Sequence, residues 1–478
     1  MESKTIEARM KLLPLALPIF FDLMLKTLFN SIDIFMISHY SHRAVAGVGT
    51  ASQVIFFMTM LYFVVGQGSG IAISQNLGAK RSHRAEKTAA IALISNYIFG
   101  MIASLIFIMY GKNIIGLFNM ESDVAAFATD FISIVMGLSF NFAGSIVVGS
   151  ILRNYGYTRA VMIINIGTNV LNIIGNILVL YGPFGIPVLG VTGVAISTVT
   201  AQGLGFVANM IYLQKKVPIF RVFRSLARTG ITEIKGILRD ILVIGAPSAG
   251  EYMSYTLCQI CITWMIVNHM GTAAQTARIF AGTVIGYLIL ANSSIATASS
   301  IMVSFNIGAG RREKAFRLAV RNLIIAQVVS VSLAIILSVF RARVIGIFTD
   351  DSWIITTAST LLLFNIIIEP GRCFNMVIGN SLRGAGDVKF ILLLGLSIQW
   401  TVLLGGAYFF GVAMGMGLIG VWLAQSIDEW TRGIIMILRW RSRKWESKSL
   451  VPRVETIGQS ETDAELALES VTDSINRM

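Results

Sequence analysis

The stretch PLALPIFFDLMLKTLFNSIDIFMISHY, residues Pro14 to Tyr40, decides the fold, because it is long and apolar enough to cross a bilayer and yet carries charges. At about 100° per residue, Asp22, Lys26, Asn30 and Asp33 fall on one face of a helix. Each charge at the centre of a membrane helix costs on the order of 2.5 to 3.5 kcal/mol. We therefore expect this face to turn toward protein partners or water rather than lipid.

The three charges of this stretch differ in their nearest partners. Asp22 and Lys26 are four residues apart and can pair on the helix surface, whereas Asp33 has no basic residue within one turn. Asp33 is the best candidate for a carboxylate that changes protonation or binds a cation. The alternative interpretation is that all three are helix-end charges whose side chains reach water.

The composition excludes an ordinary soluble protein. The 478 residues have a mean hydropathy of +0.74, and only 13% of them are charged. These values predict an α-helical integral membrane protein surrounded by a lipid bilayer. The net charge of +13 lies mainly in short connections between apolar spans, so it indicates membrane orientation rather than binding to nucleic acid.

About twelve apolar spans of membrane-crossing length can be drawn along the chain. The connections after even-numbered spans are basic, and those after odd-numbered spans hold few bases. By the positive-inside rule, both termini are expected in the cytoplasm of a multi-pass protein of the plasma (inner) membrane.

Short motifs recur on either side of a basic midpoint segment, at a spacing of about 230 residues. Four sets match in the same order: Pro18 and Asp22 with Pro247 and Glu251; Ser74, Asn76, Gly78 and Ala79 with Ser304, Asn306, Gly308 and Ala309; Leu152, Arg153 and Gly156 with Leu382, Arg383 and Gly386; Gly190, Gly193 and Val194 with Gly417, Gly420 and Val421. The matches predict two six-helix bundles related by a pseudo-two-fold axis along the membrane normal. The expected domains are an N-lobe (1–214), a cytoplasmic linker (215–237), a C-lobe (238–440) and a flexible cytoplasmic tail (441–478).

The fifth span places Asn165, Asn169, Asn172 and Asn176 on one helical face. Their amides offer carbonyl oxygens to a cation and donors to a carboxylate, so we expect them to face Asp33. The same residues could equally serve only to hold neighbouring helices together through interhelical hydrogen bonds.

In the C-lobe, four charges are expected to be buried, Glu251, Arg278, Glu369 and Arg372, and they are balanced in sign, which indicates a structural lock, a gate or an ion site. A cavity for a hydrophobic cation needs apolar and aromatic walls with a few polar groups. The candidates for lining it are Gln53, Met60, Tyr252, Tyr255 and Tyr287.

Four ordered motifs make the sequence resemble the multidrug and toxic compound extrusion (MATE) family, in its bacterial DinF-like branch. They are NSIDIFMISHYSHRAVAGVG after the first span, SQNLGAKRSHRAEK after the second, ILRNYGYTRAVMIINIGTNVLNIIGNILV leading into the fifth, and SLRGAGDVK after the tenth. The resemblance implies two lobes forming a V and export of cationic or amphipathic compounds driven by inward proton or sodium flow.

Carried onto this chain, the resemblance makes Asp33 the coupling carboxylate and Asn172 its neighbour. Asn176 stands where the family often has a second aspartate, and Asp22 and Lys26 stand where neutral residues are usual. The resemblance therefore implies that Asp22 supplies part of the missing charge. Sodium, if used in place of the favoured proton, would sit at Asp33 and Asn172. The sodium-type members carry acids on the seventh and tenth helices, about one turn from Glu251 and Glu369.

We therefore expect a secondary active multidrug exporter that acts as a monomer, and neither an enzyme nor a protein with a cofactor other than its coupling ion. The alternative within transport is a flippase for lipid-linked oligosaccharides, which would need a strongly basic central cavity. A passive channel is the third possibility, because parallel repeats are compatible with it.

Overall fold

The computed structural model describes residues 2–185, 187–226 and 228–451, and every regular element within these ranges is helical. Nine of the described helices are long and apolar enough to cross a membrane, and the pair α5 and α6, bent by 53°, makes one further span. Helices α10 and α18, of 40 and 25 residues, complete two bundles of six. The predicted all-α, twelve-helix, two-lobe fold is confirmed.

The two lobes follow the order of the chain. The N-lobe contains α2 (Leu12–Tyr40), α3 (His42–Gly78), α4 (Ser82–Gly116), α5 (Ser122–Gly137), α6 (Ser139–Asn154), α7 (Thr158–Tyr181) and α8 (Gly190–Lys216). The C-lobe contains α10 (Ile231–Met270), α11 (Thr272–Gly308), α12 (Arg312–Val339), α14 (Ser352–Cys373), α15 (Gly379–Ala385), α16 (Val388–Ile398), α17 (Gly405–Tyr408) and α18 (Gly417–Arg441). Three π-helical segments join parts of the tenth and eleventh spans: η2 (Phe374–Ile378), η3 (Gln399–Leu404) and η4 (Phe409–Ala413).

Short helices occupy the connections: α1 (Glu2–Arg9), η1 (Pro183–Gly185), α9 (Ile219–Leu226), α13 (Arg341–Ile345) and η5 (Lys444–Ser447). The expected linker, 215–237, therefore contains α9 and the first turns of α10, and Ile219 of α9 is buried. Of the expected tail, 441–478, residues beyond 451 lie outside the described part of the chain.

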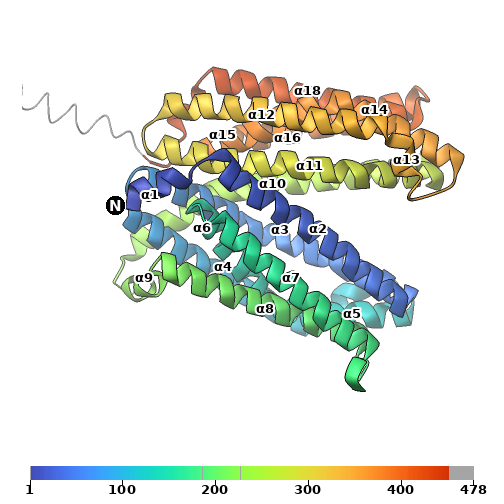
Figure 1. Ribbon diagram of the computed structural model, residues 1–478, viewed down its shortest axis with the longest axis horizontal. Coiled ribbons are helices and arrows are strands. Elements are labelled where there is room, and N and C mark those ends of the chain that lie inside the picture. Colours follow the sequence, from blue (N-terminus) through green and yellow to red (C-terminus); the bar gives the residue numbers. More distant parts are fainter. Residues whose placement is uncertain (1, 186, 227, 452–478) are drawn as a thin grey trace, which may run out of the picture.

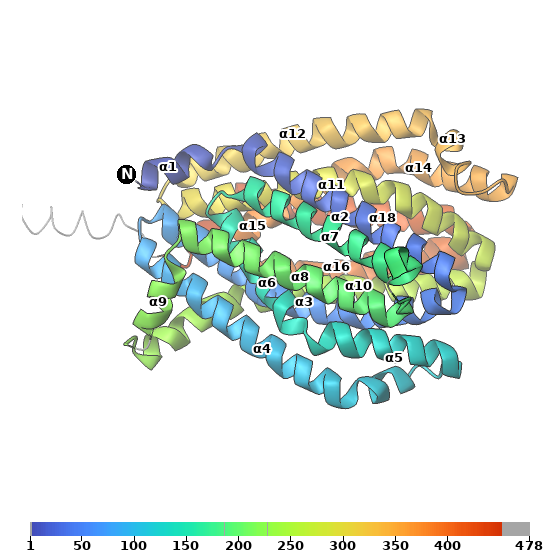
Figure 2. The same ribbon diagram turned by 60° about the horizontal axis from the view of Figure 1, so that its bottom comes forward.

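The lobes lie close together at one end of the molecule and diverge toward the other (Figure 1). The close end carries α1, α9 and the connections rich in Lys and Arg, and is called the basic end below. Figure 2, turned by 60°, again places α1 and α9 at this end and α5 and α13 at the opposite end.

Glycines set the distance between the lobes at the basic end. A Cβ atom on Gly78 of α3 would lie 1.9 Å from the carbonyl oxygen of Phe305 in α11, and one on Gly308 of α11 would lie 1.9 Å from that of Gln75 in α3. These four positions exchange places under the sequence repeat, so the contact is symmetric. Small residues allow two helix backbones to approach in this way, and side chains cannot be added without separating them.

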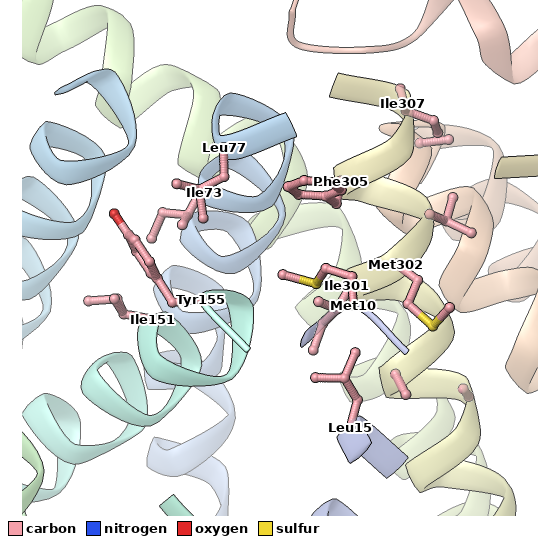
Figure 3. Packing of buried hydrophobic residues seen from close by; sticks show 14 of the residues in the cluster. Met10, Leu15, Ile73, Leu77, Ile151, Tyr155, Ile301, Met302, Phe305 and Ile307 are labelled. Carbon is pink, nitrogen blue, oxygen red and sulfur yellow. The ribbon is translucent and has the colours of Figure 1, made fainter. Parts of the chain in front are cut away.

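An apolar cluster surrounds this contact and spans both lobes. Figure 3 shows Ile73 and Leu77 of α3 near Phe305 and Ile301 of α11, all of them members of one cluster of buried residues. The basic end is therefore closed by packed side chains as well as by backbone contact.

Ion pairs reinforce the closed end. Glu7 of α1 bonds to Arg311, and it accepts a further hydrogen bond from Lys314 Nζ at 3.2 Å. The hydrogen bond from Arg311 holds the pKa of Glu7 below its usual range, so this tie is present at neutral pH and is lost only as the pH falls through that lowered pKa. Other ion pairs between the lobes here join Arg84 to Asp240 and Lys87 to Glu233.

The line of contact between the two lobes at the basic end is called the seam below. The chain makes a further contact across it near the described C-terminal end. Gln75 of the N-lobe donates to the carbonyl oxygen of Gly384 at 2.8 Å, and its own oxygen accepts from the Ser449 hydroxyl at 3.1 Å and the Leu450 backbone N–H at 2.9 Å. One buried side chain of α3 is therefore held both by a C-lobe helix, α15, and by the segment that follows the last C-lobe helix.

Adding one methyl group to the seam should open the basic end. We expect Gly308→Ala to lengthen the distance between spin labels at His83 and Arg317, measured by double electron–electron resonance, because its Cβ atom would clash with the Gln75 carbonyl oxygen. The matched control is Gly286→Ala on the same helix, where nothing lies within 4 Å of the added atom. Equal distance distributions for the two variants would contradict the role given to the glycine contact.

Candidate functional site

The two acids of α2 each meet an asparagine of α7, three helical turns apart. Asn165 Nδ2 donates to Asp22 Oδ1 at 2.9 Å, and Asn176 Nδ2 donates to Asp33 Oδ1 at 2.9 Å. The repeated spacing arises because α2 and α7 pack side by side with their polar faces in contact.

Asp33 is held by neutral groups. With its amide oriented to satisfy its neighbours, Asn172 donates to Asp33 Oδ2 at 3.2 Å while its oxygen accepts from Thr198 of α8. Within the described part of the chain Asp33 makes no ion pair, and the side-chain oxygen of the fully buried Asn176 has no hydrogen-bond partner. A carboxylate beside a free amide oxygen can accept a proton or coordinate a hard cation.

The other N-lobe residues that were predicted to form the site do not bond to Asp33. Asn169 donates to the backbone of its own helix at Asn165. Lys26 and Asn30 are exposed, and their side chains make no hydrogen bond or ion pair among the described residues, although Lys26 interacts electrostatically with Asp22. The structure thus brings Asn172 and Asn176 to Asp33 and leaves Lys26, Asn30 and Asn169 outside its hydrogen bonds.

Asp22 pairs with an arginine rather than with Lys26. Arg153, at the end of α6, lies 2.6 Å from Asp22 Oδ2, and the aspartate is only 7% exposed. The expected pair with Lys26 would have been a surface contact worth about 0.2 to 0.5 kcal/mol, whereas a carboxylate bonded to both Arg153 and Asn165 can be buried.

The C-lobe contains the equivalent pair. Glu251 of α10 bonds to Arg383 of α15, and both side chains are buried. The sequence repeat matches Asp22 with Glu251 and Arg153 with Arg383, so the two ion pairs are related by the pseudo-two-fold axis. The matched positions of acid and base in the two halves of the sequence were the signal that these residues pair.

The other predicted C-lobe charges fall into two separate places, because Arg278 does not contact Glu369 or Arg372. Arg278 is held by neutral oxygens, Thr263 Oγ1 at 2.8 Å and Gln259 Oε1 at 2.7 Å. Glu369 bonds to Arg372 on its own helix, and together they join charges from α18.

The α18 part of this cluster consists of Asp428, Glu429 and Arg432. Arg432 Nε donates to Asp428 at 2.9 Å, and Arg372 Nε lies 3.5 Å from Glu429. The buried cluster therefore holds three acids and two arginines, and one oxygen of Glu369 has no hydrogen-bond partner. An excess of one acid in a buried site favours uptake of a proton or cation there.

A cavity of about 330 Å³ lies between the lobes, lined by α2, α3 and α6 on one side and by α10, α11 and η2 to α15 on the other. Two of the candidate residues, Met60 and Tyr252, line it, together with Arg153, Gln67 and Asn380. The lining among the described residues does not include Gln53 or Tyr287, which are exposed, or Tyr255, which accepts a hydrogen bond from Gln259. The volume lies at the lower end of the range for small-molecule pockets.

Comparison with known proteins gives one consistent assignment. The family model described as MatE matches residues 18–178 and 247–418. The chain is 34% identical over 447 residues to the uncharacterized transporter YisQ of Bacillus subtilis (strain 168), covering 94% of this chain and 97% of that protein. It is 26% identical over 455 residues to the probable multidrug resistance protein NorM of Thermotoga maritima, covering 94% and 95%.

Solved structures support the same fold. A structure described as MATE in the bent conformation superposes with a TM-score of 0.81 at 20% identity, over 93% of this chain and 96% of the other. An outward-facing multidrug resistance MATE transporter of the MOP superfamily gives a TM-score of 0.80 at 20% identity, over 92% and 97%.

Removing one member of a buried ion pair should destabilise the protein strongly. Glu251→Gln leaves the Arg383 guanidinium buried without its counter-charge, and we expect a loss of about 3 to 5 kcal/mol in the free energy of unfolding. The matched control is Asp123→Asn in the exposed pair with Arg43, for which about 0 to 1 kcal/mol is expected. Thermal and denaturant unfolding in detergent measure both, and equal losses would refute the burial argument.

Proposed function

Because the chain belongs to the MatE family of membrane transporters, we propose that it is a secondary active exporter of cationic or amphipathic small molecules, driven by inward flow of protons. In this proposal the protein acts as a monomer in the plasma membrane with both termini in the cytoplasm. The basic end would then face the cytoplasm, and the diverging ends of the lobes would face outward.

The observation that carries the proposal is the environment of Asp33. A charge within a membrane span needs compensation, and the groups that bond to this carboxylate are neutral amides from α7. Protonation supplies the compensation directly. It also turns one of the two charged acceptor oxygens into a hydroxyl group that donates, which weakens the hydrogen bonds from Asn172 and Asn176 and favours their rearrangement.

This change couples protonation to conformation. Asn172 also bonds to α8, through Ser197 and Thr198, so a rearrangement at Asp33 reaches two helices of the N-lobe. The proton biases the lobe only to the extent that one arrangement of α2 and α7 holds it better than the other. We assign the state with the closed basic end to substrate release, because its cavity is sealed from the cytoplasmic side.

A second coupling site is favoured by one specific observation. The buried C-lobe cluster has one more acid than base, and an oxygen of Glu369 lacks a partner. A sodium ion or a second proton would balance it. The flippase alternative is supported less well, because Arg153 is the one cation among the described residues that line the cavity, and it is paired with Asp22.

Replacing the coupling carboxylate should abolish proton-driven transport. We expect Asp33→Asn, reconstituted in vesicles, to lose efflux of ethidium under an imposed pH gradient, because the amide can neither bind nor release the proton. Asp130→Asn, which alters an exposed carboxylate of α5, should export like the parent.

The same vesicles decide between the coupling ions and sites. Efflux under a sodium gradient that survives Asp33→Asn would move coupling to the C-lobe cluster. Parent-like proton-driven efflux by Asp33→Asn would overturn the proposed mechanism, and no efflux by the parent under either gradient would favour the flippase.

A further inference from the structure

A second hollow, separate from the central cavity, opens along the seam at the basic end. It has a volume of about 720 Å³ and runs between the start of α2 in the N-lobe and α11 and α12 in the C-lobe. Its apolar walls include Leu13, Leu318 and Ile325. Because its two sides belong to different lobes, anything bound there touches both.

The charge of this groove is positive. Lys11, Lys314 and Arg321 line it, against a single acid, Glu7, which is already bonded to Arg311 and Lys314. Lys11 and Arg321 are exposed, and the side chain of neither makes a hydrogen bond or ion pair within the described ranges. Two cations are therefore free to bind an anion.

The order of polar and apolar groups matches a membrane lipid. Lys11 immediately precedes the first membrane helix, so it lies at the level of lipid headgroups. On α12, Leu318, Arg321 and Ile325 share one face, so apolar surface continues on both sides of the arginine. The flexible stem of Arg321 can pack on that surface while its charge reaches toward the headgroups.

We propose that this groove, called the seam groove, binds an anionic phospholipid from the leaflet at the basic end. The phosphate lies between Lys11 and Arg321, and an acyl chain follows Leu13, Leu318 and Ile325. Basic pockets between membrane helices attract anionic lipids for this reason. Since the lipid contacts both lobes, it favours the conformation in which the basic end is closed.

The proposal is tested by lipid retention. The full chain is reconstituted with phosphatidylcholine and phosphatidylglycerol, extracted in detergent, and examined by native mass spectrometry for bound lipid. We expect the double variant Lys11→Gln/Arg321→Gln to bind phosphatidylglycerol about thirtyfold more weakly than the parent, the loss expected for removing two basic residues near a membrane surface. The charge-preserving variant Lys11→Arg/Arg321→Lys should bind like the parent.

Arg159→Gln is the matched control, because Arg159 is an exposed cation that lines a groove within the N-lobe alone. It should retain lipid like the parent. Retention by the double variant equal to the parent, or equal retention of phosphatidylcholine and phosphatidylglycerol, would overturn the proposal. Displacement of the lipid by soluble glycerol phosphate would show a site for free phosphate instead and would also overturn it.

The effect on conformation is read separately, with spin labels at His83 and Arg317. Phosphatidylglycerol should shorten the distance between them in the parent and leave the double variant unchanged. A shift of equal size in both would show that the lipid acts elsewhere. Neither readout depends on transport, so both remain informative if the proposed export activity is wrong.

Discussion

The structure depends on the cost of placing charge inside a membrane. The first helix of each lobe carries an acid four residues after a proline, and in each lobe that acid is neutralised by an arginine from the end of the fourth span. These two contacts fix how the first span lies against the rest of its lobe. Asp33 departs from the pattern, because amides rather than an arginine bond to it. A charge that is compensated permanently holds the fold, whereas one that is compensated only by hydrogen bonds remains free to change.

The two halves share a backbone plan but differ where chemistry can occur. The positions equivalent to Asn165 and Asn176 are Gly395 and Gly406, so the C-lobe lacks the asparagine face that meets α2. Gly395 instead leaves room for the side chain of Glu251, whose Cγ would lie 2.8 Å from an added Cβ atom. The corresponding C-lobe span is also partly π-helical. Duplication therefore gave two similar scaffolds, and divergence gave the N-lobe a hydrogen-bonded carboxylate and the C-lobe a buried ionic cluster.

Much of this architecture could be predicted from the sequence, because membrane spans and repeats leave long-range patterns. The polar face of α2 and the asparagine face of α7 follow from helical periodicity, and their meeting at Asp33 was a reasonable expectation. The partners of Asp22 and Glu251 were harder to predict, because Arg153 and Arg383 lie more than 130 residues away along the chain, at loop boundaries where arginine usually marks orientation. The π-helical segments and the joining of α14 to α18 charges depend on tertiary packing, which local propensity does not encode.

The segment that crosses the seam at Ser449 and Leu450 also bears on how the protein is made. It follows every membrane span, so it is among the last described residues to leave the ribosome, whereas Gln75 emerges when only two spans have been synthesised. Until translation passes Leu450, the Gln75 side chain lacks two of the three hydrogen bonds that it makes in the described structure. The newly inserted chain therefore passes through a stage in which all its spans are in the bilayer while the hydrogen bonds from Ser449 and Leu450 to Gln75 have yet to form.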